Sequence, residues 1–165
     1  MIKNLNKVHL IKNKISLDKR GKFLKINHKI KKQNIQYCFS FNKKKYTLRG
    51  LHFQKKPHQE IKIITCIKGS IFDVVVNINK KSKAYLKWKY FILDDKKQHS
   101  LFVGKDYAHG FLTLKNQTIV SYQILGKYFP KKQLGIIWND KKINIKWPKK
   151  PRVISLRDRN FKKLI

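Results

Sequence analysis

Apolar and polar residues alternate with a period of two along most of the chain. One strand-like run, Ile61–Ile67, leads into the turn Lys68-Gly69-Ser70, and a second, Ile71–Asn77, leads out of it. Because successive side chains of a strand point to opposite faces, this pattern predicts a β-hairpin. Six further strand-like runs are separated by clusters of Lys, Asn, Gly, Pro or Asp: Tyr46–Phe53, Leu86–Leu93, His99–Val103, Gly110–Leu114, Thr118–Leu125 and Val153–Leu156.

Many short strands at this spacing predict an all-β fold, either a sandwich, a jelly roll or a small barrel. Helix is expected only in short pieces, one within Asn27–Ile35 and one near Arg159–Leu164. With 165 residues, of which 41% are hydrophobic, and without repeats or a Pro-rich linker, we expect one domain over residues 1–165. No apolar run exceeds about four residues, so neither a secretory signal nor a membrane-spanning helix is expected.

The two cysteines, Cys38 and Cys66, are too few for a disulfide framework and lack the paired spacing of a zinc site. A soluble protein of the reducing cytoplasm fits this composition.

The formal charge of +33, from 41 Lys and Arg against 8 Asp and Glu, first suggests a nucleic-acid partner. However, only five of the basic residues are arginine, and lysines occur along almost the whole chain instead of forming one stripe. We therefore interpret the charge as a lysine-solvated surface that would attract an anionic substrate.

Strand parity places two candidate functional residues. His52 shares a strand face with Gly50, and Lys62 shares one with Ile64 and Cys66, so the two polar side chains meet if both faces point inward. The opposite reading, with Lys62 outside and the Ile61 face in the core, fits parity equally well. Arg49 lies three positions from His52, so it would need twist or a bulge to reach the same site.

The segment Leu48–Gln54, together with Lys62, Ala108–Phe111, Tyr122 and Asp158, supplies a base, a cation, an acid and an orienting carboxylate. It offers no obvious nucleophile and no complete set of metal ligands. Such a set suits proton transfer at a carbon beside a carbonyl, where an enolate must be held while the proton returns to the other face. That chemistry is epimerisation.

These residues, in this order, resemble the dTDP-4-dehydrorhamnose 3,5-epimerase family. Seven stretches carry the resemblance: Asp18–Gly21, Leu48–Gln54, Gly69–Val74, Tyr107–Leu112, Gly135–Asp140, Ile145–Pro148 and Ser155–Asp158. The resemblance implies a cupin-like jelly roll, also called a double-stranded β-helix. It further implies a homodimer that acts without a cofactor on a nucleotide-diphosphate sugar, inverting C3 and C5 of dTDP-4-dehydro-6-deoxy-D-glucose to give dTDP-4-dehydro-L-rhamnose.

The resemblance also implies roles for single residues. His52 would be the base, with Asp158 holding its ring; Tyr122 would be the acid on the other face; and Lys62 would stabilise the enolate oxygen. Substrate binding would fall to seven residues, among which Arg20 or Phe23 are candidates for donation to the neighbouring subunit: Arg20, Phe23, Gln36, Arg49, His109, Tyr128 and Arg157.

Departures from the family pattern concern nucleotide recognition. Lys25, Cys38 and Lys131 stand where the pattern has glutamate, asparagine and glutamate. The proton-transfer residues are unchanged, so another nucleotide, another 4-keto-6-deoxysugar or inversion at a single centre stays open.

Two alternatives come from other functional classes. His52, Glu60 and His109 could form a two-histidine, one-carboxylate metal site, but Gln54 occupies the position where metal cupins usually carry a second histidine. A nucleic-acid or carbohydrate-binding module would fit the charge, yet it would not need the four residues proposed for proton transfer. We therefore expect no metal and no nucleic-acid partner.

Overall fold

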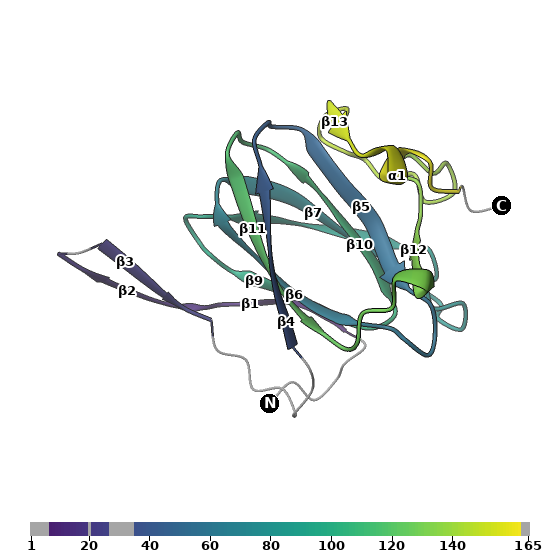
Figure 1. Ribbon diagram of the computed structural model, residues 1–165, viewed down its shortest axis with the longest axis horizontal. Coiled ribbons are helices and arrows are strands. Elements are labelled where there is room, and N and C mark those ends of the chain that lie inside the picture. The colour runs from purple at the N-terminus through teal and green to yellow at the C-terminus, as the bar shows by residue number, and fades with distance from the viewer. Residues whose placement is uncertain (1–6, 20, 27–34, 163–165) are drawn as a thin grey trace.

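The structure is a computed structural model in which residues 7–19, 21–26 and 35–162 are described. Two sheets face each other, and a separate hairpin projects away from them (Figure 1). One sheet has five strands, in the order β1 (Val8–Ile11), β9 (Ser100–Val103), β6 (Ile61–Lys68), β11 (Thr118–Leu125) and β4 (Ile35–Asn42). All its pairings are antiparallel.

The second sheet has six strands. Five of them run in the order β12 (Gln133–Gly135), β5 (Thr47–Gln54), β10 (Tyr107–Thr113), β7 (Ser70–Asn77) and β8 (Trp88–Asp94). The sixth, β13 (Val153–Ile154), pairs in parallel with β5. The projecting hairpin consists of β2 (Lys14–Asp18) and β3 (Gly21–Lys25). The described helices are the 3₁₀ turn η1 (Pro130–Lys132) and α1 (Leu156–Arg159), neither long enough to cross a membrane.

Apolar side chains from both sheets fill the space between them. Ile64, Val120 and Leu101 from the first sheet meet Val75 and Phe111 from the second in one buried cluster. A second cluster covers the outer face of the six-stranded sheet, where the segment after β12 packs against β5, β7 and β10. The eight residues of β7 are therefore buried on both faces.

The all-β fold predicted from the sequence is confirmed, but the predicted Ile61–Asn77 hairpin is wrong. Both runs are strands, yet β6 pairs with β9 and β11 while β7 pairs with β8 and β10. Gly69, with φ +86°, turns the chain from one sheet into the other, and a side chain there would clash with Thr118. The turn signal was real, but long-range partners decided the pairing.

Several other boundaries also differ from the sequence predictions. The pattern gave no strand before Tyr46, whereas β1, β2, β3 and β4 lie there, and it missed the short β12. The C-terminal helix spans Leu156–Arg159 and so ends where the predicted one begins; the strand before it stops at Ile154. The helix expected within Asn27–Ile35 lies outside the described residues, apart from Ile35, which begins β4.

Candidate active site

The candidate site lies on the inward faces of strands from both sheets. Lys62 precedes Ile64 and Cys66 of the central core cluster on the same face of β6, and Tyr122 packs against that cluster from β11. The other face of β6 is also buried, because Ile61 and Ile63 form a separate cluster. Parity alone could not choose between the two readings because both faces of this strand are apolar and covered.

A β-bulge brings Arg49 onto the face of His52. In the β5–β10 ladder, His52 pairs with His109 and Arg49 pairs with Phe111, so two residues of β5 lie opposite the single Gly110. The extra residue shifts the alternation of side chains by one position. Gly50 sits in the bulge with φ +123°, and a Cβ there would collide with the Gly110 backbone. The local sequence therefore needs glycine at this position to bring the two residues together.

His52 is hydrogen-bonded to Asp158. Its Nε2 atom lies 2.8 Å from Asp158 Oδ1, and the backbone N–H of Gly50 donates to the other carboxylate oxygen at 2.9 Å. Ser155 caps α1 by accepting from the Asp158 backbone N–H at 3.1 Å, which fixes where the carboxylate points. Because a carboxylate only accepts, the proton of a neutral ring sits on Nε2, and Nδ1 keeps the lone pair of a base.

The Asp158 carboxylate is stabilised in its charged form. Burial by itself would raise its pKa, but the hydrogen bond and charge of His52, followed by the Gly50 and Ser155 contacts, hold that pKa below its usual value. Asp158 is therefore an anion at neutral pH.

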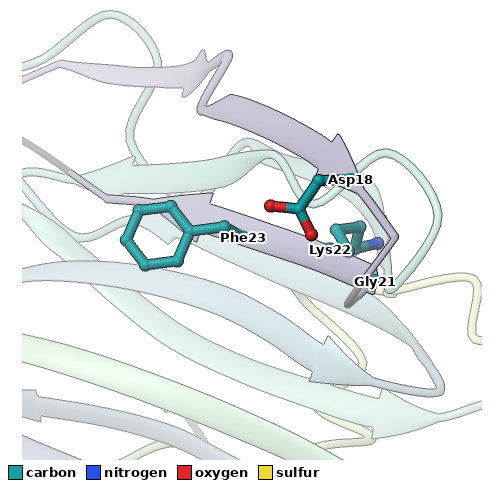
Figure 2. Close-up of a pocket in the computed structure, with 4 residues that line it drawn as sticks. All are labelled: Asp18, Gly21, Lys22 and Phe23. Carbon is teal, nitrogen blue, oxygen red and sulfur yellow. The ribbon is translucent and has the colours of Figure 1, made fainter.

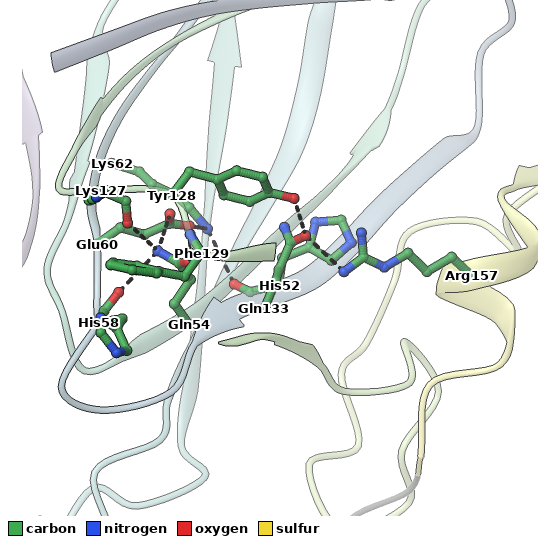
Figure 3. Close-up of polar contacts among 10 residues, drawn as sticks. All are labelled: His52, Gln54, His58, Glu60, Lys62, Lys127, Tyr128, Phe129, Gln133 and Arg157. Carbon is green, nitrogen blue, oxygen red and sulfur yellow. Dashed lines mark hydrogen bonds and ion pairs between the residues drawn. The ribbon is translucent and has the colours of Figure 1, made fainter. Parts of the chain in front are cut away.

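Lys62 contacts β5, the strand that carries His52. Its Nζ atom forms an ion pair with Glu60 Oε1 at 2.9 Å and donates to the backbone carbonyl of His52 at 3.3 Å (Figure 3). Both members of the ion pair are buried. Of the two readings that strand parity left open, these contacts match the one with Lys62 turned toward the strand of His52, and they join Lys62 to the backbone of His52 instead of its ring.

His109 forms a second histidine–carboxylate pair, with Asp73. Its Nε2 atom lies 2.9 Å from each oxygen of Asp73, which is fully buried. Burial raises the pKa of Asp73, while the charges of His109 and Lys62 act in the opposite direction. Sequence reasoning did not single out Asp73 as a site residue, although a carboxylate in the otherwise apolar run Ile71–Val76 was the available signal.

Tyr122 lies beside this second pair. Its ring meets the His109 ring edge to face, with centroids 6.3 Å apart, and its backbone neighbours in the sheet are Ile64 and Cys38. Burial, reinforced by the charge of Asp73, raises the pKa of Tyr122 well above the ordinary tyrosine range, against a smaller effect of Arg49. The phenol is thus protonated at neutral pH and able to act as an acid.

A more exposed polar group lies on the other side of His52. Gln133 accepts from Tyr128 Oη at 3.0 Å and from Arg157 Nη2 at 2.8 Å, so one amide oxygen joins two predicted binding residues (Figure 3). The ring of Phe161 contacts His52 edge to face and lies under the Arg157 guanidinium. Sequence reasoning missed Gln133 and Phe161, because neither belongs to a recognisable motif.

Of the remaining predicted binding residues, Arg49 lies on the face of His52, whereas Gln36 and Phe23 lie on β4 and on the projecting hairpin. Arg49 Nε donates to Asn42 Oδ1 at 2.9 Å, and Gln36 is exposed on β4 opposite Ile124. Phe23 lies on the projecting hairpin, where a cavity of about 450 Å³ is lined by Phe23 with Asp18, Gly21 and Lys22 (Figure 2). Arg20 is outside the described residues.

Metal binding gains no support from the geometry. Within residues 7–19, 21–26 and 35–162, no three His, Cys, Asp or Glu side chains are grouped so that they could hold an ion. His52 and His109 each bond a separate aspartate, and Glu60 bonds Lys62.

Comparison with known proteins gives a consistent result. The family model of dTDP-4-dehydrorhamnose 3,5-epimerase matches residues 3–165. The enzyme of that name from Shigella flexneri is 33% identical over 159 residues, which cover 92% of this chain and 88% of the relative.

Solved structures agree. The crystal structure of dTDP-4-dehydrorhamnose 3,5-epimerase from Bacillus anthracis with TDP and PPi bound is 33% identical, with a TM-score of 0.90 over 98% of this chain and 96% of that one. The Legionella pneumophila dTDP-6-deoxy-D-glucose-3,5-epimerase in complex with dTDP-4-keto-L-rhamnose is 28% identical, with a TM-score of 0.88 over 96% and 90%. The chain therefore belongs to the dTDP-4-dehydrorhamnose 3,5-epimerase family of isomerases.

Proposed function

We propose that the protein converts dTDP-4-dehydro-6-deoxy-D-glucose into dTDP-4-dehydro-L-rhamnose by inverting C5 and C3 through enolate intermediates. The observation that carries this proposal is the arrangement of His52 on Asp158, beside Lys62 and near the His109–Tyr122 contact. A base, a fixed cation and a neutral phenol are the three groups that two-face proton exchange next to a ketone requires.

In the first step, His52 Nδ1 removes the proton from the carbon beside the C4 ketone. The electron pair of the broken C–H bond moves into the ring, and the negative charge develops on the C4 oxygen. The imidazolium that forms is stabilised by the ionised Asp158, 2.8 Å away. The His52 side chain is 27% exposed, so its proton can pass to solvent before the next cycle.

Lys62 meets the developing oxyanion. Fixed positive charge in a buried site needs no reorganisation when the enolate forms, which is why such groups lower barriers strongly. His109, held by Asp73, lies next to both His52 in the β5–β10 ladder and the ring of Tyr122. We assign to it a hydrogen bond with the sugar between the two proton-transfer residues.

In the second step, Tyr122 donates its hydroxyl proton to the carbon from the opposite face. The C–H bond re-forms with inverted configuration, the oxyanion returns to a ketone, and the phenolate recovers a proton from solvent. The raised pKa of Tyr122 ensures that the proton is present at neutral pH. The same pair of residues serves both carbons if the sugar shifts slightly between the two inversions.

Substrate binding is assigned to a basic and aromatic set at the edge of the site. Arg49 and Arg157 supply guanidinium groups for the diphosphate, Tyr128 offers a ring for the base, and Gln36 an amide. The Tyr128–Gln133–Arg157 connection supports joint action of two of these residues. Cys38 lies on the same face of β4 as Gln36, so it is a candidate for altered nucleotide recognition.

A homodimer completes the proposal. Among the described strands, β4 lies at the edge of its sheet and pairs with β11 alone, and it exposes Tyr37, Phe39 and Phe41 on its outer face, each more than half exposed. Phe23 and Leu17 are similarly exposed on the hairpin. A second copy of the chain would bury both surfaces and carry Arg20 and Phe23 to the neighbouring site. We place this single epimerase domain, residues 1–165, in the cytoplasm.

The decisive experiment is incubation of the protein with dTDP-4-dehydro-6-deoxy-D-glucose in D₂O, followed by NMR at C3 and C5. Deuterium at both carbons with formation of the L-rhamno product is expected. Deuterium and inversion at only one carbon would replace the double inversion by a single one. If neither carbon exchanges, this substrate is wrong, and other nucleotide-linked 4-ketosugars become the candidates.

A further inference from the structure

Glu60 is a buried acid next to the site, and the proposed proton-transfer steps do not use it. It is the only glutamate among the eight acidic residues of the chain. Its two carboxylate oxygens have different partners: Oε1 bonds Lys62 Nζ at 2.9 Å, and Oε2 accepts from Gln54 Nε2 at 3.0 Å (Figure 3). The glutamate and lysine side chains are 8% and 9% exposed, so water screens the pair only weakly.

Gln54 is held in one orientation. Its Oε1 accepts from the Phe129 backbone N–H at 2.8 Å, which obliges the amide nitrogen to face the other way. That nitrogen lies 3.0 Å from the His58 carbonyl and 3.3 Å from the Lys127 carbonyl, besides Glu60, so its two N–H groups are shared among three acceptors. Gln54 is only 2% exposed. The amide thus ties the β5–β6 loop to the segment after β11 and presents a fixed donor to Glu60.

The Lys62 ammonium has three N–H donors. Among the described residues, Glu60 and the His52 carbonyl take up two of them. One donor is left for a ligand, and its direction is set by the other two. The His52 carbonyl belongs to the residue proposed as the base. The third N–H group of Lys62 is therefore held close to the place where the substrate would lose its proton.

The energetics favour such an arrangement. A lone ammonium in a nearly dry interior carries a large desolvation cost, and a carboxylate in contact offsets it. Had the carboxylate been free to turn, the ammonium could follow it away from the site; the Gln54 contact removes that freedom.

We propose that Glu60, fixed by Gln54, is a positioning residue that holds the charged Lys62 ammonium with one donor directed at the enolate oxygen. This inference rests on the proposed function, because it concerns the oxyanion of that reaction. Glu60 itself does not touch the substrate; it acts through Lys62. The competing explanation is that Glu60 and Lys62 form an ion pair that stabilises the fold alone.

The test compares Glu60→Gln with wild type in kcat, KM and the rate of deuterium wash-in from D₂O. Glutamine keeps the shape but loses the charge. We expect kcat and wash-in to fall together by about 10- to 100-fold, less than the 10²–10³-fold typical of deleting an oxyanion donor itself, with KM within about threefold. Loss of wash-in separates this variant from one that lacks only the reprotonating acid.

The matched control is Asp106→Asn, which removes the same charge from a neighbouring loop. Asp106 bonds the side chains of Gln59 and Asn79, and in the described part of the chain neither Lys62 nor His52 is among its hydrogen-bond or ion-pair partners. Its kcat should match that of wild type. An equal loss in both variants would mean that general electrostatics, and not the position of Lys62, explains the effect.

A double-mutant cycle with Lys62→Met identifies the route of action. If Glu60 acts through Lys62, adding Glu60→Gln to Lys62→Met changes wash-in by less than about twofold. A full additional loss in that background overturns the proposal. Should Glu60→Gln fail to fold, Glu60→Asp keeps the charge but retracts it by one methylene; it should lower kcat at unchanged KM, and wild-type kcat there would equally overturn the proposal.

The outcome is separable from a failure of the proposed function. An active wild type with an unaffected Glu60→Gln variant refutes only the positioning role. A wild type with neither wash-in nor product refutes the reaction, whatever Glu60 does.

Discussion

The interior of the molecule and its β4 edge differ in whether their side chains find partners within the chain. Inside, three basic side chains each meet a carboxylate of the same chain: His52 meets Asp158, Lys62 meets Glu60, and His109 meets Asp73. Along the edge, β4 presents Tyr37, Phe39 and Phe41 to solvent, and the hairpin presents Phe23. One region is internally satisfied, whereas the other exposes the kind of surface that proteins usually cover.

The difference has a physical cause. Charges can remain in a core only when each is met by an opposite charge or a hydrogen bond, and the residues proposed for proton transfer find these partners within one chain. An aromatic edge has no such requirement and gains free energy when a partner removes it from water. Chemistry should therefore depend on single interior residues, and substrate affinity should depend also on what covers the edge.

The largest effect is expected from removing the proposed base. His52→Ala should lower kcat by about 10² to 10⁴ or more, since general bases typically contribute that much. The fold should persist, because His52 is partly exposed and its loss leaves Asp158 still bonded to Gly50 and Ser155. Steady-state kinetics and circular dichroism test this, with His99→Ala, in the loop before β9, as the control. Wild-type turnover in His52→Ala would remove the base assignment.

Tyr122→Phe should break the reaction into its two halves. The variant keeps the base and Lys62, so deuterium wash-in at the abstracted carbon should continue, while inverted product falls by about 10²-fold or more. NMR of the sugar in D₂O reports both signals in one sample. Joint disappearance of wash-in and product would show that the phenol does more than return the proton.

The interior could be anticipated from the sequence better than the edge. The pairing of His52 with Asp158 followed from the resemblance to a family, and the shared face of Lys62, Ile64 and Cys66 followed from parity. The position of Arg49 could not be read, because the bulge depends on how β10 lies against β5. Asp73 was overlooked because its partner, His109, lies 36 residues away in sequence.

The sequence pattern did not predict the β4 edge, for a different reason. In β4 the outward residues are aromatic and the inward ones polar, with Gln36, Cys38 and Ser40 facing the site. Alternation of this kind normally marks a strand whose apolar side faces the core, but in β4 the apolar side faces outward. A strand of this kind makes sense when its apolar face is covered by another chain, which one sequence does not display.

Mutating the exposed edge should weaken association before it affects chemistry. Phe39→Ser combined with Phe41→Ser removes two aromatic side chains, each worth about 1.5–3 kcal/mol when buried, and so should raise the dimer dissociation constant at least about 10-fold. Light scattering against concentration measures this, and KM should rise more than kcat falls. Ile92→Ser, on the exposed face of β8 at one edge of the six-stranded sheet, serves as the control. A monomeric wild type would refute the dimer.

Asp158→Asn should lower the free energy of unfolding by an amount that depends on pH. The folded pKa of Asp158 lies below its usual value, so its contribution is present above the unfolded pKa, near 3.8, and is lost as pH falls through the folded pKa. We expect a deficit in unfolding free energy of about 1–3 kcal/mol at pH 7. Urea titrations should show this deficit shrinking below pH 3.8. A deficit that does not depend on pH would indicate lost packing instead.

The smallest effect, a few-fold change in labelling rate, compares the two regions through their cysteines. Cys66 is buried in the central cluster, and burial raises its pKa to about 12, so its thiolate is scarce at pH 8. Cys38 is exposed on β4 beside Tyr122. Iodoacetamide should therefore modify Cys38 alone in the folded protein and both cysteines in urea, as mass spectrometry would show.

Because Cys38 faces the site, saturating dTDP should slow its modification several-fold. The double variant Phe39→Ser with Phe41→Ser should reduce that protection if a second copy completes the nucleotide site. Unchanged protection in a monomeric variant would mean that one chain binds the nucleotide unaided. The β4 edge would then matter for dimer formation but not for nucleotide binding.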